Sequence, residues 1–125
     1  MKENKSNTIL NQYLREKRKD GFYCYYEVKV AKGNSFQFSK IEVGQNTGLP
    51  ALENEGMVWK FSDEDSRVKP CDGFSGPPLP AYLIIKFKTS FYFVRYYKIQ
   101  ELKAQGKVSI SLEKAKELAD KVVHT

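Results

Sequence analysis

The sequence predicts an α/β (α+β) fold in which helices flank a mixed central β-sheet. Apolar residues recur at helical spacing near both ends of the chain, and segments between them alternate apolar and polar residues as half-buried strands do. A length of 125 residues suits one hydrophobic core. We therefore expect a single domain, 1–125, with the element order α-β-α-β-β-β-β-α.

A helix and a strand are predicted at the start of the chain. Residues 8–19 carry an apolar stripe at helical spacing. The candidate caps of this helix are Ser6, Asn7 and Thr8. Residues 22–30 alternate strictly, which predicts a strand with Glu27 and Lys29 on one face and Val28 on the other.

A second helix is predicted from Ser39, because Glu42 three residues later completes a capping box. Pro50 limits its first stretch to about Gly48, since proline disfavours helix in the preceding residue, and a further turn through Glu53 can follow after a kink. Gln45 falls in the apolar stripe, where a buried amide without a partner costs roughly 1–3 kcal/mol. Its amide therefore either reaches solvent past the core or has a polar partner.

The second half of the chain predicts strands and then helices. Four further strands are expected at 57–62, 71–74, 81–88 and 91–97. The last two form a hairpin, and a short helix follows at 99–105. Ser111 caps a final helix that continues through Val123.

Composition excludes several classes of protein. Apolar residues (41%) and aromatic residues (14%) are too abundant for a disordered chain, and no apolar run reaches the ~20 residues that span a bilayer. The polar N-terminus is unlike a signal peptide, so we expect a cytoplasmic protein without a membrane part. Cys24, Cys71 and a single His124 are too few for a disulfide framework or a zinc site. His124 is expected to fray at the terminus.

The net charge of +6 is distributed unevenly along the chain. Basic residues cluster at the end of the first helix and again around the predicted hairpin, interleaved with aromatic residues. This pattern suits a polyanion, because cationic side chains displace the counterions condensed on phosphates. The candidate nucleic-acid contacts are Arg15, Lys17, Arg18, Lys19, Lys40, Lys69 and Lys86.

Glu27-Val28-Lys29 is the pattern that points most directly to chemistry. On a strand, the Glu27 and Lys29 side chains leave one face at a spacing of about 6–7 Å. Carboxylates bind Mg²⁺, which promotes phosphodiester hydrolysis, and a nearby lysine positions the attacking water. Most isolated pairs of this kind are solvent-facing and structural. Here Tyr23 and Tyr25 lie on the same face as Glu27 and Lys29, so this face is not simply a solvent-exposed polar one.

The segments that follow this strand carry a resemblance to a known family. The strand leads through residues 35–41 into a helix that bears Gln45, and residues 69–74 read Lys-Pro-Cys-Asp-Gly-Phe. Together they resemble the PD-(D/E)xK nucleases, most closely the Holliday junction resolvases of the RecU type. The resemblance covers roughly residues 22–88 and implies a restriction-endonuclease-like core.

This resemblance implies a catalytic site, a cofactor and a partner. Asp72 and Glu27 would be ligands of Mg²⁺, for which Mn²⁺ can substitute, with the carbonyl of Val28 as a third ligand. Lys29 would position the attacking water, and Gln45 would support the lysine or the scissile phosphate. The family further implies branched DNA as the substrate and a homodimer, since two symmetric cuts need two sites.

The order of the two motif halves departs from the family pattern. The Pro-Asp half normally precedes E-x-K, whereas Asp72 follows Glu27 by 45 residues. Either the core is permuted, and the two carboxyl groups lie within about 5 Å of each other, or Asp72 is a turn residue. The tripeptide at 84–86, Ile-Ile-Lys, follows Asp72 and so offers a lysine in the family order, but it has no carboxylate in place of the glutamate. Glu16 and Asp63 are reserve ligands.

Two other functions stay open, together with the position of the dimer surface. The strand 91–97 has aromatic residues on both faces, so one face is a candidate dimer surface unless helices cover both.

The protein could instead bind nucleic acid without cutting it, on a degenerate nuclease fold, or serve as an interaction module. Substituting Glu27 and Asp72 abolishes cleavage in a nuclease but leaves the affinity of a mere binder almost unchanged.

Overall fold

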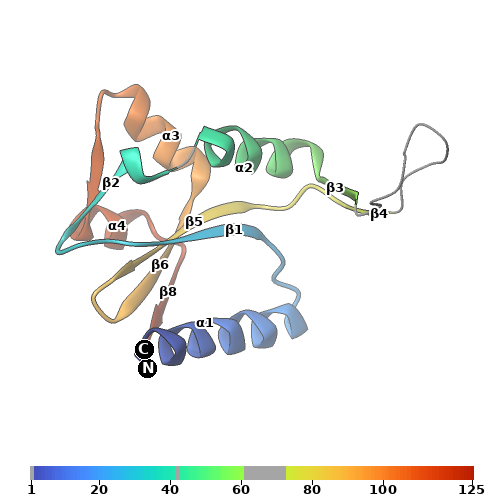
Figure 1. The fold of residues 1–125 in the computed structure, drawn as a ribbon, viewed down its shortest axis with the longest axis horizontal. Helices are drawn as coiled ribbons and strands as arrows, with labels where there is room; N and C mark the ends of the chain where they lie inside the picture. The colour runs from blue at the N-terminus through green and yellow to red at the C-terminus, as the bar shows by residue number, and fades with distance from the viewer. Residues whose placement is uncertain (1, 42, 61–72) are drawn as a thin grey trace.

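Helices lie on both faces of a mixed β-sheet in the computed structural model (Figure 1), which confirms the predicted α/β class. The structure describes residues 2–41, 43–60 and 73–125, with the backbone alone at 2–4, 43–47, 58–60 and 73–74. In chain order the elements are α1 (Lys2–Lys19), β1 (Tyr25–Val30), β2 (Ser35–Gln37), the 3₁₀ helix η1 (Phe38–Lys40), α2 (Val43–Glu55), β3 (Met57–Lys60), β4 (Gly73–Gly76), β5 (Ala81–Phe87), β6 (Ser90–Arg95), α3 (Tyr96–Ala104), β7 (Ser109–Ser111), α4 (Leu112–Leu118) and β8 (Lys121–His124). No helix in these ranges is long and apolar enough to cross a membrane.

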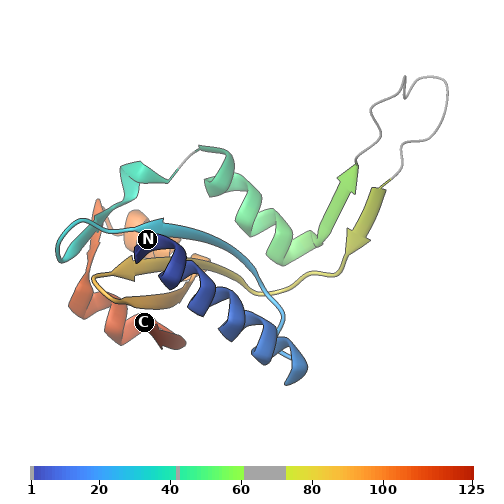
Figure 2. The same ribbon diagram turned by 60° about the horizontal axis from the view of Figure 1, so that its bottom comes forward.

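The main sheet has the strand order β1-β5-β6-β8. β1 runs parallel to β5, and the other neighbours are antiparallel, so β1 is an edge strand of this sheet. Its register places Glu27 opposite Leu83 and Lys29 opposite Ile85. Two short ribbons accompany the sheet in the described part of the chain: β2 pairs with β7, and β3 pairs with β4. The β3–β4 ribbon projects away from the body of the molecule (Figure 2).

The sheet separates two apolar clusters. One lies against α2, α3 and α4 and includes Leu49, Leu83, Ile85, Val94, Ile99 and Ala115. The other lies against α1 and consists of Leu10, Tyr82, Ile84, Phe91, Phe93 and Val123. β5 and β6 send alternate side chains into each cluster, which explains why both strands are apolar almost throughout.

The aromatic strand β6 therefore offers no free surface. Phe91 and Phe93 face α1, Tyr92 and Val94 face the other helices, and none of the four is more than 6% exposed. The prediction of a dimer surface on this strand is wrong, because helices cover both of its faces.

The first helix and strand differ from prediction mainly at their starts. α1 already begins at Lys2, so the cap predicted around Ser6 is wrong. Ser6 is instead buried, and its hydroxyl accepts a hydrogen bond of 3.0 Å from Lys86 on β5. β1 begins at Tyr25 rather than at residue 22, but the predicted alternation is confirmed, since Val28 packs toward α1 and Tyr25 toward the opposite cluster.

α2 begins later and runs longer than predicted. Ser39 does not cap it, because residues 38–40 form η1, and Glu42 lies outside the described residues. The helix continues from Val43 through Pro50 without a break. Pro50 has no N–H group and so forfeits one intrahelical hydrogen bond, a loss that burial of the neighbouring Leu49 offsets.

The C-terminal segment ends in a strand that the sequence analysis missed. Ser111 caps α4 as predicted, since its hydroxyl accepts from the amide of Lys114 at 3.1 Å. The helix stops at Leu118, however, and residues 121–124 pair with β6 as β8. His124 does not fray, because its Nδ1 atom lies 2.7 Å from the hydroxyl oxygen of Ser90.

Candidate nucleic-acid and metal site

β1 presents the E-x-K pair on the face of the sheet where α2, α3 and α4 pack. Glu27 and Lys29 alternate with Val28, which packs toward α1. The Nζ atom of Lys29 lies 3.7 Å from Oε1 of Glu27, and the two side chains are 19% and 33% exposed respectively. The prediction that they share one face is confirmed, and together they form a half-buried charge pair.

The backbone of β1 turns the carbonyl of Val28 away from the sheet. The amides of Tyr25 and Ala31 donate to the carbonyls of Pro80 and Lys86, both at 2.9 Å. Alternate residues of a parallel strand bond to the same neighbour, so the odd-numbered residues of β1 face β5. The Val28 carbonyl consequently points out of the sheet edge.

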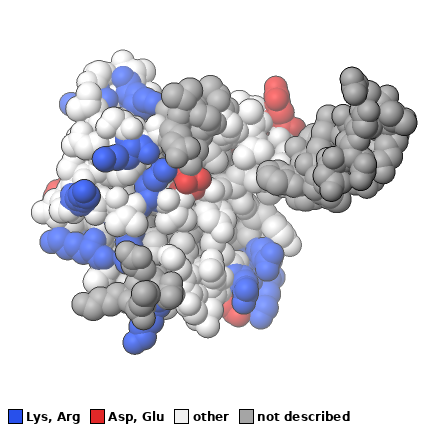
Figure 3. All heavy atoms as spheres, in the orientation of Figure 1, with Lys and Arg blue, Asp and Glu red and all other residues white. Residues whose placement is uncertain are grey.

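Beyond Lys29 the surface is hollowed and basic. A hollow of about 520 Å³ is lined by Lys29, Val30, Lys32, Ser35, Phe36, Gln37 and Lys40. Among the residues that the structure describes, the wall contains three lysines and no carboxylate, and one of these lysines, Lys29, is paired with Glu27. Lys40 is a predicted contact. Lys32 was missed because it stands in a Lys-Gly-Asn turn signal. It pairs with Ser35 across that turn, and both residues line the hollow. Figure 3 shows basic side chains gathered over this side of the molecule, with few acidic ones among them.

The remaining residues of the predicted catalytic site fall partly outside the described chain. Asp72, Lys69 and Asp63 lie outside the described residues, and so does the proposed proximity of Asp72 to Glu27. Gln45 belongs to α2, which packs against β1 and β5, but its side chain is not among those described.

The predicted basic contacts of α1 lie on the opposite face of the sheet from the Glu27–Lys29 pair. Arg15 and Arg18 line a groove of about 420 Å³ between α1 and β1, together with Phe22 and Tyr26. Lys17 stacks on a tyrosine of the same helix, with its Nζ atom 5.5 Å from the ring centroid.

Two further candidates, Glu16 and Lys86, are engaged elsewhere on that same side. Glu16 pairs with Lys19 at 3.2 Å on the exposed side of α1, so it does not join Glu27 as a reserve ligand. The ammonium of Lys86 donates to Ser6 and lies 5.7 Å from the ring centroid of Phe91. Lys86 thus connects α1 to the sheet, a role that its place in a basic cluster did not indicate.

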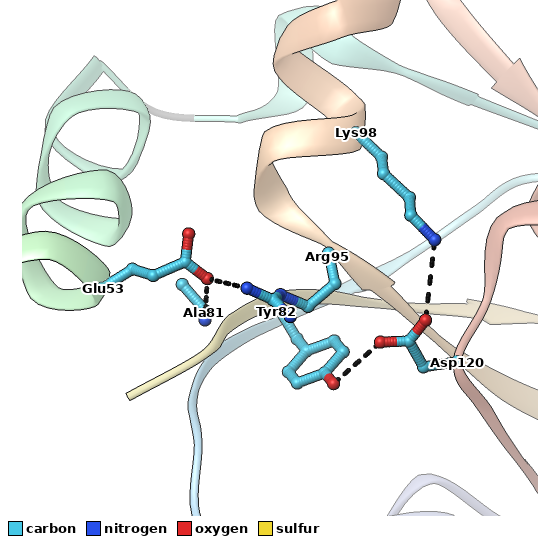
Figure 4. A network of polar contacts seen from close by, with 6 residues as sticks. All are labelled: Glu53, Ala81, Tyr82, Arg95, Lys98 and Asp120. Carbon is cyan, nitrogen blue, oxygen red and sulfur yellow. Dashed lines mark hydrogen bonds and ion pairs between the residues drawn. The ribbon is translucent and has the colours of Figure 1, made fainter. Parts of the chain in front are cut away.

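A network of polar contacts at the start of β5 was also missed by the sequence analysis (Figure 4). One oxygen of Glu53, on α2, accepts from the Ala81 amide at 2.9 Å and from Arg95 at 2.7 Å. The Tyr82 hydroxyl donates to Asp120 at 2.9 Å. Burial, together with that hydrogen bond, raises the pKa of Tyr82 well above its ordinary value. The network joins α2 to β5, β6 and the residue before β8, so we assign it a structural role.

Cys24 is the one thiol among the described residues, and its surroundings make it unreactive. Burial raises its pKa to about 11, and nearby Lys121 lowers it only in part. A thiol with such a pKa is almost fully protonated near neutral pH, so Cys24 is a poor nucleophile and a poor metal ligand.

The metal-binding potential of the described residues rests on one carboxylate and one carbonyl. No group of three or more His, Cys, Asp or Glu side chains comes together within the described ranges. Glu27 and the outward carbonyl of Val28 supply oxygen ligands of the types that Mg²⁺ takes, and this ion commonly uses one or two carboxylates and completes its shell with waters and phosphate oxygens. No family model, curated protein or solved structure matches this chain.

Proposed function

We propose that this protein is a metal-dependent DNA endonuclease that cuts branched DNA. One observation carries the proposal: Glu27 and Lys29 share a half-buried face of an edge strand, and Lys29 also lines a hollow whose charged wall residues, among those the structure describes, are lysines. A phosphodiester in that hollow would have ammonium groups on one side and the carboxylate on the other.

The residues of β1 divide the chemistry between them. Glu27 and the Val28 carbonyl would hold Mg²⁺, which lowers the pKa of a bound water and stabilises charge on the phosphate. Lys29 would hold the attacking water or the developing negative charge from the other side. Asp72 and Gln45 are proposed to complete the site, and a homodimer is proposed to make the paired cuts.

A second function, nucleic-acid binding without cleavage, is favoured by a specific observation. Within the described residues Glu27 is the only carboxylate that pairs with Lys29, and the pair can be read as a charge pair of an edge strand. On this view the lysine hollow binds phosphate and no bond is broken.

The test is a cleavage assay on four-way junctions, flaps, nicked duplexes and plain duplex, with Mg²⁺, with Mn²⁺ and with EDTA. Glu27→Gln and Lys29→Met should each lower the cleavage rate at least about a hundredfold, because each removes a group that acts mainly in the transition state. Affinity for DNA, measured in EDTA by gel shift, should change little for Glu27→Gln.

Matched controls are Glu55→Gln and Lys116→Met, which make the same chemical changes at exposed positions outside β1 and outside the wall of the Lys29 hollow. Both should cut at the wild-type rate. If the wild-type protein binds these DNAs but cuts none of them with either metal, the endonuclease proposal fails and the non-catalytic function takes its place.

A further inference from the structure

We propose that the Arg15–Arg18 groove between α1 and β1 binds single-stranded DNA, with phosphates on the two guanidinium groups and a base stacked on the ring of Tyr26. This groove lies on the opposite face of the sheet from Glu27 and Lys29. The inference therefore adds a second nucleic-acid site, which goes beyond the site proposed for cleavage and does not depend on it.

Two rows of side chains form the groove. Asn11, Arg15 and Arg18 line it from α1, where they recur at helical spacing. Phe22 and Tyr26 line it from the chain that returns beside the helix, where alternate residues share a face. Arg18 follows Asn11 by seven residues, which is about 10 Å along the axis of a helix. A stacked strand that rises about 3.4 Å per nucleotide would place about three nucleotides along this length.

The end of α1 fixes one end of the groove. Gly21 has a φ of 90°, and its amide donates to the Arg18 carbonyl at 3.0 Å. The amide of Phe22 donates to the Lys17 carbonyl at 2.9 Å. These two bonds form a Schellman motif, which glycine completes without steric strain. Arg18 and Phe22, which face each other across the groove, thus belong to one turn whose shape is set before a ligand binds.

Arg15 and Arg18 supply the positive charge of the groove. Among the residues that the structure describes, no carboxylate pairs with either guanidinium group. The two arginines also line a second hollow of about 530 Å³, whose other charged wall residues, Glu16 and Lys19, pair with each other at 3.2 Å. A guanidinium group binds phosphate through two parallel hydrogen bonds, so both arginines are available to a nucleic-acid backbone.

Exposed tyrosines stand on both sides of the arginines. Tyr26, in the groove, is 43% exposed, and Tyr23, in the second hollow, is 54% exposed. The faces of bases stack on such rings, and these faces are open only where a strand is unpaired. The arrangement therefore favours a single strand over a duplex. Binding should be tolerant of sequence, because every base has a face that can stack.

The experiment measures affinity for a single strand of about a dozen thymidines and for a duplex of equal length. Binding is followed by fluorescence anisotropy in EDTA over a range of salt concentrations. Tyr26→Leu removes the ring but keeps an apolar side chain, and Arg15→Gln combined with Arg18→Gln removes the two charges. Thermal midpoints establish that each variant is folded.

Each variant has a matched control elsewhere on the molecule. Tyr97 is also 43% exposed and lines neither hollow, so Tyr97→Leu makes the same change away from the groove. Lys5→Gln combined with Lys116→Gln removes two exposed charges outside both hollows. Both controls should bind the single strand as the wild type does.

The two groove variants should lose affinity in different ways. Tyr26→Leu should bind the single strand at least about fivefold more weakly with an unchanged salt slope, because stacking involves no counterion release. Its affinity for the duplex should not change. The double arginine variant should reduce the slope of log affinity against log salt by about 1.4 units, since each phosphate contact on a single strand contributes about 0.7.

Three outcomes would overturn the inference. Tyr26→Leu and Tyr97→Leu could bind the single strand equally well, in which case no base stacks in the groove. Tyr26→Leu could weaken the duplex as much as the single strand, in which case the groove does not select unpaired bases. Thymidine monophosphate could bind as tightly as the strand, in which case the ligand is a free nucleotide.

Because binding is measured without metal, this inference and the endonuclease proposal fail separately. A wild-type protein that binds single strands through Tyr26 but cuts no DNA retains the groove and loses the endonuclease. A protein that cuts, and whose Tyr26→Leu and Tyr97→Leu variants bind alike, retains the endonuclease and loses the groove.

Discussion

At the scale of single residues, the Lys86 ammonium illustrates how a basic residue can be used internally. Its amine donates to the hydroxyl of Ser6, which is only 9% exposed, and lies over the ring of Phe91. Both contacts hold α1 against β5. A phosphate that took Lys86 as its contact would have to break them.

We predict that Lys86→Met destabilises the protein by about 1–3 kcal/mol, because it leaves the buried Ser6 hydroxyl without its donor. The methionine keeps most of the packing of the lysine stem. Urea unfolding measures the loss, with the exposed Lys116→Met as the control. If the variant were as stable as the wild type but bound DNA more weakly, Lys86 would instead be a nucleic-acid contact, as the sequence predicts.

Residue patterns predicted the candidate pair but not its surroundings. Strand alternation alone placed Glu27 and Lys29 on one face and Val28 on the other, because a strand has a period of two whatever packs on it. The use of Lys86 and Glu53 could not be predicted in this way, since each bonds to an element far along the chain.

At the scale of elements, the attachment of α2 determines where the proposed site lies. Glu53, in the last turn of α2, accepts from the first amide of β5 and from Arg95 at the end of β6. A single carboxylate oxygen thus fixes the helix to two neighbouring strands (Figure 4). Because α2 also packs against β1, a shift of this helix would change the face that bears Glu27.

We predict that Glu53→Ala lowers the free energy of unfolding by about 2–3 kcal/mol, since the half-buried Arg95 loses a charged partner and the Ala81 amide loses its acceptor. The exposed Glu55→Ala, two residues away on the same helix, should change it by less than about 0.5 kcal/mol. Chemical denaturation measures both. Equal effects for the two would mean that the network adds nothing to the attachment of α2.

Element boundaries were predicted well where a local signal sets them and poorly where pairing sets them. Ser111 caps α4 by a contact within four residues, and that prediction is confirmed. Val122 and Val123 continue the helical spacing of α4, yet they form β8 because β6 offers an open neighbour on that side. The short strands β2 and β7 have too few residues for a period to be recognised.

At the scale of the whole molecule, three layers depend on one another. The sheet is covered by α1 on one side and by α2, α3 and α4 on the other, so β6 is closed on both faces. The sequence predicted one sheet with flanking helices, but it did not indicate which helix covers which face. That assignment decides that the Glu27–Lys29 pair and the Arg15–Arg18 groove lie on opposite sides.

We predict that Leu10→Asp abolishes the folded state, because Leu10 is 3% exposed in the cluster between α1 and the sheet. A buried, unpaired carboxylate costs several kcal/mol, and a domain of this size is stable by only about 5–15 kcal/mol. Gln12→Asp, exposed on the same helix, is the control and should fold normally. Circular dichroism and elution volume distinguish the two. A folded Leu10→Asp protein would show that α1 is not needed to close the sheet.

The position of β1 at the sheet edge has a consequence for how copies of the chain avoid one another. The outward N–H and C=O groups of an edge strand are a template for strand addition by another molecule, and charged side chains on the strand oppose it. The even-numbered face of β1 gives little protection, since Val30 is 69% exposed. With alanine at both Glu27 and Lys29, the strand would read Tyr-Tyr-Ala-Val-Ala-Val, an uncharged segment prone to intermolecular pairing. The two charged side chains proposed to act on phosphate therefore also oppose aggregation through the sheet edge. A variant with alanine at both positions would lose solubility as well as the proposed cleavage activity.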